Sequence, residues 1–437
     1  MEPSKRLLSL DVFRGLTIAG MILVNNPGDW GNIYAPLRHA AWHGCTPTDW
    51  IFPFFLFIVG VAISIALGKR KDRGDAPAAM YRKIGYRAAV IFGLGVFLAA
   101  FPHFRFEGPA WLQTVHYLLL SVAMLAVFVR EIFDQELFQS PGYQNARKWL
   151  GYVALGAAIL MALIGLNHYY LGTLRIPGVL QRIAIVYALA SLLFLHYSPR
   201  VLFGVAVVLL LGYWGLMTLV PVPGGLAPNL EPGTNLAAWS DRTVFGIQHL
   251  WSQSKTWDPE GFLSTIPAIG TAIAGILTGE LLRSPKTGMQ KVIWLLISGA
   301  ILIALGQLWN LVFPINKALW TSSYVLYVGG LAQVFLAASY WLIDLKGIKA
   351  WSKPFEIYGV NALFAFVLSG VLAKLMSAIH WQIDAETTQT VRGWLYDTLF
   401  TPYFSPINAS LGFAILHIAF IFLCSWALYR YRIFIKV

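Results

Sequence analysis

Long apolar segments and short polar connections alternate along almost the whole chain. About twelve of these segments have the roughly 20 residues that a helix needs to cross the hydrocarbon core of a membrane. They lie at about 9–26, 48–68, 83–101, 110–129, 148–166, 177–197, 200–220, 262–283, 290–312, 318–343, 355–376 and 406–430. The pattern predicts an all-α, polytopic membrane bundle of about twelve transmembrane helices that forms a single domain over residues 1–437.

The composition agrees with this prediction and excludes an ordinary soluble domain. Hydrophobic residues make up 57% of the chain and charged residues only 12%, against about 25% charged residues in a typical soluble domain. The first segment carries Asp11 and Arg14 and lacks a small-residue cleavage site, so we expect it to be retained rather than removed as a signal peptide. The two cysteines are far apart in the sequence and suggest neither a disulfide framework nor a thiolate metal site.

The basic residues predict the orientation of the bundle. If the amino terminus is cytoplasmic, the inner connections hold 23 of the 32 lysines and arginines, as the positive-inside rule requires. An even number of spans then places the carboxyl terminus in the cytoplasm as well. The formal net charge of +12 therefore reflects topology. We expect no nucleic-acid partner, since the basic residues are spread over separate loops without a recognition module.

With this orientation, four polar strings gather on the outer face. They are residues 25–49, 175–182, 258–261 and 316–320. Outer loops are often polar simply because they are in water, but here the charges run into the apolar spans. Arg182, about two turns inside its span, is the clearest case, and such a group costs roughly 2.5–3.5 kcal/mol to insert. The strings therefore indicate a site built between helices at the outer face.

These strings, with two others, resemble those of a known enzyme family. The residues that carry the resemblance are Ser9-Leu10-Asp11-Val12-Phe13-Arg14-Gly15, Leu37 to Gly44, Thr48-Asp49 followed by Phe52-Pro53-Phe54, Arg175 to Arg182, Asp258 to Gly261, and Asn316-Lys317-x-Leu319-Trp320. In the same order along nearly the whole chain, they resemble the heparan-alpha-glucosaminide N-acetyltransferase family, which includes a lysosomal transmembrane enzyme and bacterial relatives.

The resemblance implies that an acetyl group passes from cytoplasmic acetyl-CoA to an amino sugar on the other side of the membrane. It places His39 at the position of the active-site histidine and Asn25 at that of an assisting asparagine. Two departures accompany it. The loop between Asn25 and His39 is a few residues longer than in the lysosomal enzyme, and residues 107–168 add a two-helix segment.

No part of this sequence resembles the large luminal domain of the lysosomal enzyme, so we expect a small amino sugar such as glucosamine as the acceptor. With the topology, the resemblance also predicts an integral protein of the bacterial inner membrane whose His39 loop is periplasmic. The long outer loop at about 221–261 is a candidate lid. A homodimer is our hypothesis for the assembly.

The chemistry of acetyl transfer also favours a histidine. The sugar amine must lose a proton while a thioester carbonyl becomes a tetrahedral oxyanion, and a histidine is suited to proton transfer near neutral pH. His39 acts in this reading either as a general base or as a transient acetyl carrier, which would give ping-pong kinetics. Asn25, Arg175 or Lys317 is a candidate donor to the oxyanion.

The remaining candidate residues divide between the two substrates. For the acceptor we predict Asp49, Arg175, Arg182, Asp258, Glu260, Asn316, Lys317 and Trp320. Each has a structural alternative: Asp49 suits a helix cap or the orientation of His39, and Asp258 and Glu260 suit a helix start. His43 suits a solvated loop. Most outer tryptophans and tyrosines suit an interfacial belt, with one or two as sugar contacts.

For coenzyme A we predict contacts on the inner face, where water and positive charge are available. The candidates are Asp11, Arg14, Lys69, Arg70 and Arg82. Asp11 and Arg14, three residues apart on one helical face, also suit a structural ion pair. The sequence contains no glycine-rich phosphate loop, and we expect no metal. The pantetheine arm would need to rise between the helices toward His39.

Two other functions fit parts of the same pattern. A secondary transporter of a sugar or other small solute would also have about twelve spans and intramembrane charges, but we find no internal repeat and no polar cluster midway through the spans. An acyltransferase acting on a lipid or cell-wall glycan would use the same outer histidine with another acceptor.

Overall fold

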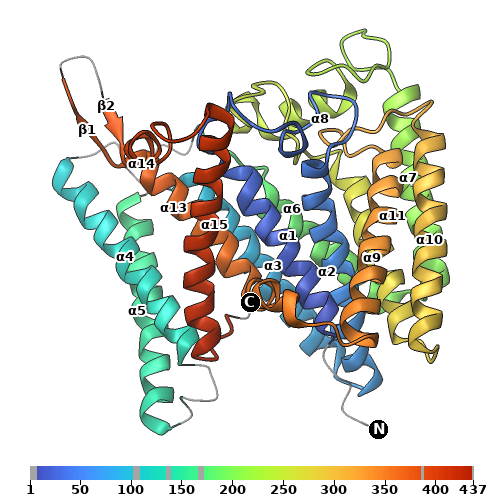
Figure 1. The fold of residues 1–437 in the computed structure, drawn as a ribbon, viewed down its shortest axis with the longest axis horizontal. Coiled ribbons are helices and arrows are strands. Elements are labelled where there is room, and N and C mark those ends of the chain that lie inside the picture. Colours follow the sequence, from blue (N-terminus) through green and yellow to red (C-terminus); the bar gives the residue numbers. More distant parts are fainter. Residues whose placement is uncertain are drawn as a thin grey trace.

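The computed structural model describes residues 7–101, 109–133, 138, 140–165, 172–384 and 388–435, and helices dominate it (Figure 1). The α-helices are α1 (Leu8–Asn25), α2 (Pro47–Asp72), α3 (Pro77–Ala100), α4 (Ala110–Ile132), α5 (Pro141–Gly165), α6 (Val179–His196), α7 (Pro199–Leu219), α8 (Leu236–Phe245), α9 (Thr265–Arg283), α10 (Gly288–Trp309), α11 (Ser322–Ser339), α12 (Lys353–Val360), α13 (Ala362–Ala378), α14 (Val391–Leu399) and α15 (Pro406–Arg430). The short elements are η1 (Ala35–Leu37), η3 (Ile247–His249), η4 (Tyr340–Leu345), η5 (Ala350–Ser352), β1 (His380–Gln382) and β2 (Thr388–Thr390). The two strands pair antiparallel, with His380 opposite Thr390. The protein is an all-α polytopic membrane protein, as predicted.

Every predicted span coincides with helix, but the number that qualifies as membrane-spanning is lower than twelve. Among the described residues, ten helices are long and apolar enough to cross a membrane, and eleven if the bent pair of α12 and α13 counts as one span. The predicted span 110–129 corresponds to α4, whose described apolar part, Thr114–Arg130, is shorter than those of the others.

The predicted span 355–376 is wrong as a single helix. It is broken at Asn361 into α12 and α13, whose axes differ by 74°. The Asn361 side chain explains the break, because its Nδ2 donates to the carbonyl of Ile433 (3.0 Å) and its Oδ1 accepts from the N–H of Ile435 (2.9 Å). These bonds tie the segment after α15 to the break instead of continuing the helix.

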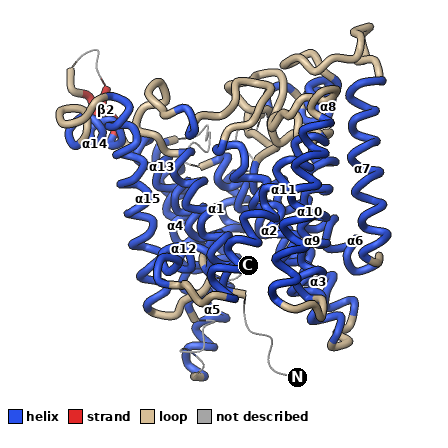
Figure 2. The backbone as a smooth tube through the Cα atoms, turned by 45° about the vertical axis from the view of Figure 1, so that its right-hand side comes forward, coloured by secondary structure: helices blue, strands red, loops and turns tan. Residues whose placement is uncertain are grey.

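The connections that carry the predicted site lie together at one end of the bundle. Figures 1 and 2 show the loops after α1, around α8 and before α11 gathered at the upper end, whereas α1 begins and α15 ends at the lower end. The orientation relative to the cytoplasm stays a prediction. Of the basic residues on which it depends, Lys5, Arg6, Arg105 and Lys436 lie outside the described residues.

The helix pair α2–α9 forms the centre of the core and positions the outer site. Gly60 and Gly275 let the two backbones touch: a Cβ at Gly60 would lie 2.0 Å from the carbonyl oxygen of Ala272, and one at Gly275 would lie 2.0 Å from that of Phe57. Small residues at a helix crossing are how membrane helices associate closely. This contact fixes the start of α2 relative to α9.

The contact predicts a large difference between two glycine substitutions. We expect Gly275→Ala to destabilise the protein by roughly 1–3 kcal/mol, because the added methyl must push two backbones apart. Gly212→Ala in α7 should have little effect, since no atom lies within 4 Å of the Cβ it would add. Thermal unfolding of both variants in the same detergent measures the difference. Equal midpoints would contradict the close packing of α2 on α9.

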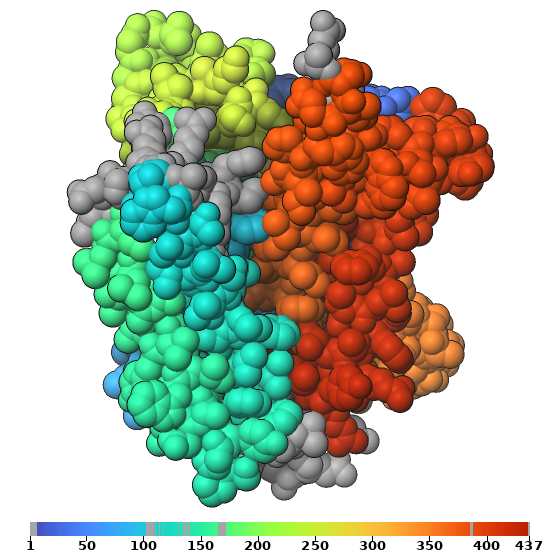
Figure 3. Space-filling view, turned by 90° about the vertical axis from the view of Figure 1, so that its left-hand side faces the viewer, coloured from blue at the N-terminus to red at the C-terminus, as the bar shows by residue number. Residues whose placement is uncertain are grey.

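The helices α4 and α5 occupy the described part of the predicted added segment, 107–168, and pack mainly on each other. They stand at the periphery, on the opposite side of the bundle from α7 and α10, beside α13 and α15 (Figures 1 and 3). One aromatic contact to the main bundle joins Phe128 to Phe364, with ring centroids 6.2 Å apart. Within the described residues, the hairpin therefore adds to the periphery of the bundle.

Candidate active site

The loop between α1 and α2 is held in place by hydrogen bonds at several points along its length. Thr48 Oγ1 donates to the carbonyl of Pro36 (3.0 Å), and Thr46 Oγ1 donates to that of Arg38 (2.7 Å). Trp42 Nε1 donates to the carbonyl of Leu230 in the outer segment before α8 (2.9 Å). His39, between these points, thus projects from a loop with a defined course.

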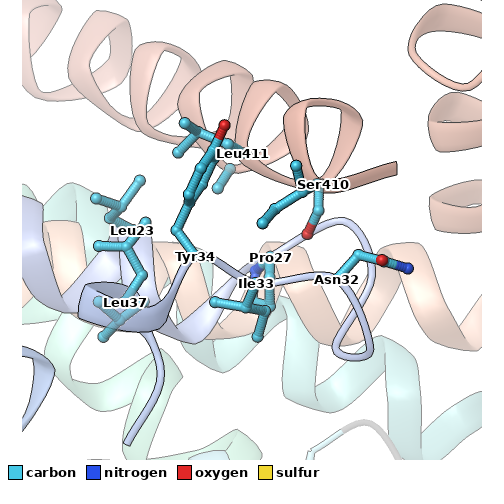
Figure 4. A pocket seen from close by; sticks show the side chains of 11 residues that line it. Leu23, Pro27, Asn32, Ile33, Tyr34, Leu37, Ser410 and Leu411 are labelled. Carbon is cyan, nitrogen blue, oxygen red and sulfur yellow. The ribbon is translucent and has the colours of Figure 1, made fainter. Parts of the chain in front are cut away.

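The other side of the same loop packs against α15 (Figure 4). An apolar pocket there is lined from the loop and the end of α1 by Leu23, Pro27, Tyr34 and Leu37, among others, and from α15 by Leu411 and its neighbours. Hydrogen bonds reinforce this contact. Tyr34 Oη donates to Asn408 Oδ1 (2.6 Å), and the N–H of Gly28 donates to the carbonyl of Ser410 (3.0 Å).

Asp49 in the first turn of α2 organises the end of the loop. Its side chain is only 1% exposed, and Oδ2 accepts from the N–H groups of Thr46 (2.9 Å) and Ala40 (3.1 Å). Thr46 Oγ1, which donates to the carbonyl of Arg38, lies 3.1 Å from the same oxygen. This is the capping arrangement expected of an acidic residue at the third helical position. The predicted role as a cap is present, and it leaves Oδ1 for another partner.

That partner is His39. Its Nδ1 lies 2.6 Å from Asp49 Oδ1, whereas the His39 side chain is 44% exposed. A carboxylate only accepts hydrogen bonds, so Nδ1 carries the proton and Nε2 keeps its lone pair when the ring is neutral. The arrangement orients a histidine base toward the open side of the loop, which is the second role predicted for Asp49.

Lys317 lies against the same imidazole. Its Nζ is 3.2 Å from His39 Nδ1, 3.3 Å from Nε2 and 3.9 Å from Asp49 Oδ1. Burial lowers the pKa of the Lys317 amine, against the opposing effect of the Asp49 and Glu260 carboxylates. Residues 278 positions apart thus form one cluster of base, carboxylate and amine.

Asn316 and Trp320 support the turn that presents Lys317. Asn316 is fully buried, and its side chain accepts from the N–H of Leu319 (2.9 Å) and contacts His43 Nδ1 (3.3 Å). Trp320 is also fully buried and has a left-handed backbone, with φ of 52°. Both were predicted to bind the acceptor; the structure gives them internal partners, and a contact with the acceptor stays a prediction. His43 is exposed in the loop, as predicted, and its contact with Asn316 ties it to the turn.

A second cluster joins Arg175, Asp258 and Glu260, the residues predicted from two other outer strings. Arg175 donates to both Asp258 oxygens, at 2.8 and 2.6 Å, and to Glu260 Oε2 at 2.7 Å. Asp258 is buried, whereas 29% of the Arg175 side chain is exposed. These partners raise the pKa of Arg175 despite the opposing effect of burial. The sequence analysis predicted that these residues share the outer face of the bundle. In the structure they form one cluster of ion pairs.

Arg182 connects the second cluster to the Lys317 turn. It is 1% exposed, and its Nη2 donates to the carbonyl of Gly261 (3.0 Å) and to Ser264 Oγ. Its guanidinium lies 5.1 Å from the centre of a Trp320 ring, a cation–π distance. Arg182 therefore holds the 258–264 segment and Trp320 together from inside the bundle.

Asp241 in α8 is a further residue of this cluster, and the sequence analysis missed it. Its two carboxylate oxygens accept from the N–H groups of Asp258 (3.1 Å) and Phe262 (2.8 Å), so it fixes the turn that carries Asp258 and Glu260. Burial raises the pKa of Asp241 to about 6. No motif marks this residue, which lies 17 positions before Asp258 in a segment that looked like a lid.

This raised pKa predicts a pH-dependent stability. A carboxyl whose pKa rises from 3.8 to about 6 on folding stabilises the fold fully below pH 3.8, and that contribution is lost as the pH rises through 6. Between pH 3.8 and pH 6, the unfolding free energy of the wild type should fall by about 3 kcal/mol relative to that of Asp241→Asn. Denaturation of both proteins at several pH values measures the difference, and a difference that does not vary with pH would contradict it.

Asn25 is placed differently from the residues above. It is the last residue of α1 and is exposed, and no contact in the described part of the chain joins it to His39. Its neighbour Asn26 is buried and donates to the carbonyl of Ile22 (2.8 Å) and to Ser369 Oγ (3.3 Å). A partnership of Asn25 with His39 stays a prediction.

The predicted coenzyme residues lie at the other end of the bundle. Arg14 Nη1 donates to Asp11 Oδ1 (3.2 Å) and to the carbonyl of Gly359 (3.4 Å), which is the predicted ion pair at the crossing of α1 and α12. Lys69 and Arg82 are exposed, and Arg70 lies 3.7 Å from Asp75. These residues form a basic surface where α2 ends and α3 begins. The positive-inside rule alone would also place basic residues there.

Comparisons with known proteins agree with the resemblance in the sequence. Residues 6–139, which include His39, Asn25 and Asp49, match the family described as "Heparan-alpha-glucosaminide N-acetyltransferase, catalytic". The heparan-alpha-glucosaminide N-acetyltransferase of Homo sapiens is 25% identical over 414 residues, or 83% of this chain and 52% of the human protein. That of Mus musculus is 25% identical over 433 residues, or 88% of this chain and 56% of the mouse protein.

The chain thus spans about half the length of the curated relatives that it matches. The match to the human protein covers most of this chain. The match to the family includes the loop that carries His39. At the level of the family, these comparisons support the resemblance of this membrane protein to the heparan-alpha-glucosaminide N-acetyltransferases, a family of transferases.

Proposed function

We propose that this protein is a transmembrane N-acetyltransferase that moves an acetyl group from cytoplasmic acetyl-CoA to the amine of glucosamine or a related amino sugar on the extracytoplasmic side. The observation that carries the proposal is the hydrogen bond of 2.6 Å between His39 Nδ1 and Asp49 Oδ1, with the Lys317 amine beside the same ring. Acyl transfer to an amine requires a base and a donor to the oxyanion, and this cluster supplies both.

In the direct route, His39 acts as the general base. Its Nε2 takes a proton from the sugar amine as the nitrogen attacks the thioester carbonyl, and the tetrahedral intermediate expels the coenzyme thiolate, which takes up the proton. Lys317 donates to the oxyanion, and Asp49 stabilises the imidazolium that forms. In the alternative route, Nε2 attacks the thioester first and passes the acetyl group to the amine afterwards. Both routes use the same nitrogen and the same partners.

The acceptor site in this proposal lies between His39 and the cluster of Arg175, Asp258 and Glu260. Carboxylates in this cluster suit the ammonium and hydroxyl groups of an amino sugar. The edge-to-face pair of Trp42 and Trp257, with ring centroids 5.1 Å apart, offers an aromatic surface beside the His39 loop. Glu260 is the member that links the two clusters, because its charge acts on both Arg175 and Lys317.

The donor site in this proposal begins at the basic surface formed by Lys69, Arg70 and Arg82, with Arg14 and Asp11 near the path of the coenzyme. The pantetheine arm would rise between the helices toward His39, over about 15 Å, or half of the hydrocarbon core. We further propose that the protein lies in a bacterial inner membrane with His39 on the periplasmic side. A homodimer stays a prediction.

A transfer assay tests the proposed function. Purified protein in detergent is given labelled acetyl-CoA and a panel of amino sugars, and the N-acetylated products are identified by mass spectrometry. We expect transfer to glucosamine or a close relative. No transfer to any amine, together with solute uptake by proteoliposomes, would refute the enzyme and favour a transporter.

A further inference from the structure

We propose that Lys317 is itself acetylated by this protein when no acceptor amine is bound, which inactivates the site. The inference rests on the proposed function, because it requires acetyl-CoA to reach His39. It adds a modification site and a consequence that the acetyl transfer alone does not imply: the amino sugar protects the enzyme from its own donor.

The geometry places Lys317 over the His39 ring, 3.2 Å from Nδ1 and 3.3 Å from Nε2, so a rotation of its flexible side chain brings the amine to the position required of an acceptor. A general base must lie within hydrogen-bonding reach of the proton that it removes, and Lys317 Nζ is 3.3 Å from His39 Nε2. The 2.6 Å bond from Nδ1 to Asp49 orients the ring for this contact. A primary amine next to an oriented histidine reproduces, within the chain, the arrangement required of the sugar nitrogen.

The protonation states of Lys317 and Cys45 favour the lysine amine over the cysteine thiol as the nucleophile. Burial lowers the pKa of the Lys317 amine, which increases the share of the neutral, nucleophilic form. Cys45, at the end of the same loop, is affected in the opposite direction, because burial and the Asp49 charge raise the pKa of its thiol to about 12. The thiol stays protonated, so the amine is the group that attacks a thioester here.

The reaction is balanced without any further reactant. The lone pair of Lys317 Nζ attacks the carbonyl carbon of acetyl-CoA, and a proton passes from Nζ to His39 Nε2. The carbon–sulfur bond of the tetrahedral intermediate breaks, a carbon–nitrogen bond remains, and the coenzyme thiolate takes the proton from the imidazolium. The products are free coenzyme A and an amide on Lys317.

The modification removes two properties of the site at once. An acetylated Lys317 has no positive charge to offer a developing oxyanion, and the acetyl group occupies space beside His39. Amides do not exchange back under these conditions, so acetylated molecules accumulate. An acceptor amine that reaches the carbonyl first prevents this outcome.

Peptide mass spectrometry tests the inference on the full chain in detergent. The protein is incubated with isotope-labelled acetyl-CoA, without acceptor, and the acetylation of Lys317 is compared with that of Lys255. Lys255 is an exposed lysine in the outer segment after α8 and reports the background chemical reaction. We expect label on Lys317 at least about tenfold above that on Lys255, suppressed by glucosamine and absent in His39→Ala.

A second measurement follows activity. Wild-type protein incubated with acetyl-CoA alone should lose transferase activity over time, and Lys255→Arg should lose it at the same rate. Lys317→Arg keeps a cation but lacks a primary amine, so whatever activity it starts with should not decline. Transfer to glucosamine without label on Lys317 would refute the self-acetylation and leave the proposed function standing. Transfer to neither amine would refute the proposed function.

Discussion

Replacement of His39 by alanine should reduce acetyl transfer by roughly 10²–10⁴-fold, the contribution of a positioned general base. The side chain is 44% exposed, and its hydrogen bond goes to Asp49, so its removal leaves no buried cavity. Expression, thermal stability and binding of coenzyme A should therefore be close to those of the wild type. Steady-state turnover with acetyl-CoA and glucosamine measures the loss.

His43→Ala is the matched control for this experiment. His43 lies four residues from His39 in the same loop, but it contacts Asn316 rather than Asp49 or Lys317. We expect this variant to lose only a small part of its activity. If His39→Ala kept wild-type turnover, or if His43→Ala lost as much as His39→Ala, His39 would not be the base.

Asp49→Asn should reduce turnover by a comparable factor, on the order of 10²–10⁴-fold, although the side chain keeps its shape. The substitution removes the charge that stabilises an imidazolium and permits the wrong tautomer of His39, with Nε2 protonated. An amide oxygen in the place of Oδ2 still accepts from the N–H groups of both Ala40 and Thr46, so the cap survives, and the amide nitrogen then faces His39 Nδ1. Comparison of kcat and KM locates the effect, and we expect most of it in kcat.

Thr46→Val separates the cap from the orientation of His39. It removes the Thr46 hydroxyl, which donates to the carbonyl of Arg38 (2.7 Å) and contacts Asp49 Oδ2 (3.1 Å), and it leaves the Asp49–His39 bond in place. This variant should lose roughly 0.5–2 kcal/mol of stability, as capping residues do, with turnover within a few-fold of the wild type. A kcat for Asp49→Asn as high as that of Thr46→Val would mean that Asp49 is only a cap.

The sequence was sufficient for the long helices and for the first half of the candidate site. Apolar runs of fixed length predicted the long helices, because lipid requires long apolar helices whatever their packing, but they did not predict the short helices α8 and α14. His39 and Asp49 are ten residues apart in one loop, and the two roles open to Asp49 are both present. The break at Asn361 was not predicted, because a single asparagine in an apolar run does not reveal which backbone groups it will bind.

The second half of the site depends on contacts that no sequence pattern encodes. Lys317 meets His39 across 278 positions, and Asp241 stabilises the Asp258 turn without any motif of its own. Asn316 and Trp320 show the opposite difficulty. Their string looked like a ligand-binding surface, and their polar atoms bind the chain itself, so a role toward a ligand stays a prediction for them. A list of polar residues cannot distinguish side chains that support a site from those that face a ligand.

The α1–α2 loop is attached to two different groups of helices, and this has a consequence for catalysis. Tyr34 and Gly28 bind it to α15, whereas Trp42 and Thr46 bind it to the outer segment before α8 and to the start of α2. His39 therefore cannot swing out as an independent flap. A motion of α15 relative to α2 would act on the loop, and a shift of about 1 Å between them would misplace the base enough to cost on the order of 10²-fold in rate. Turnover should thus be sensitive to the thickness and lateral pressure of the surrounding bilayer.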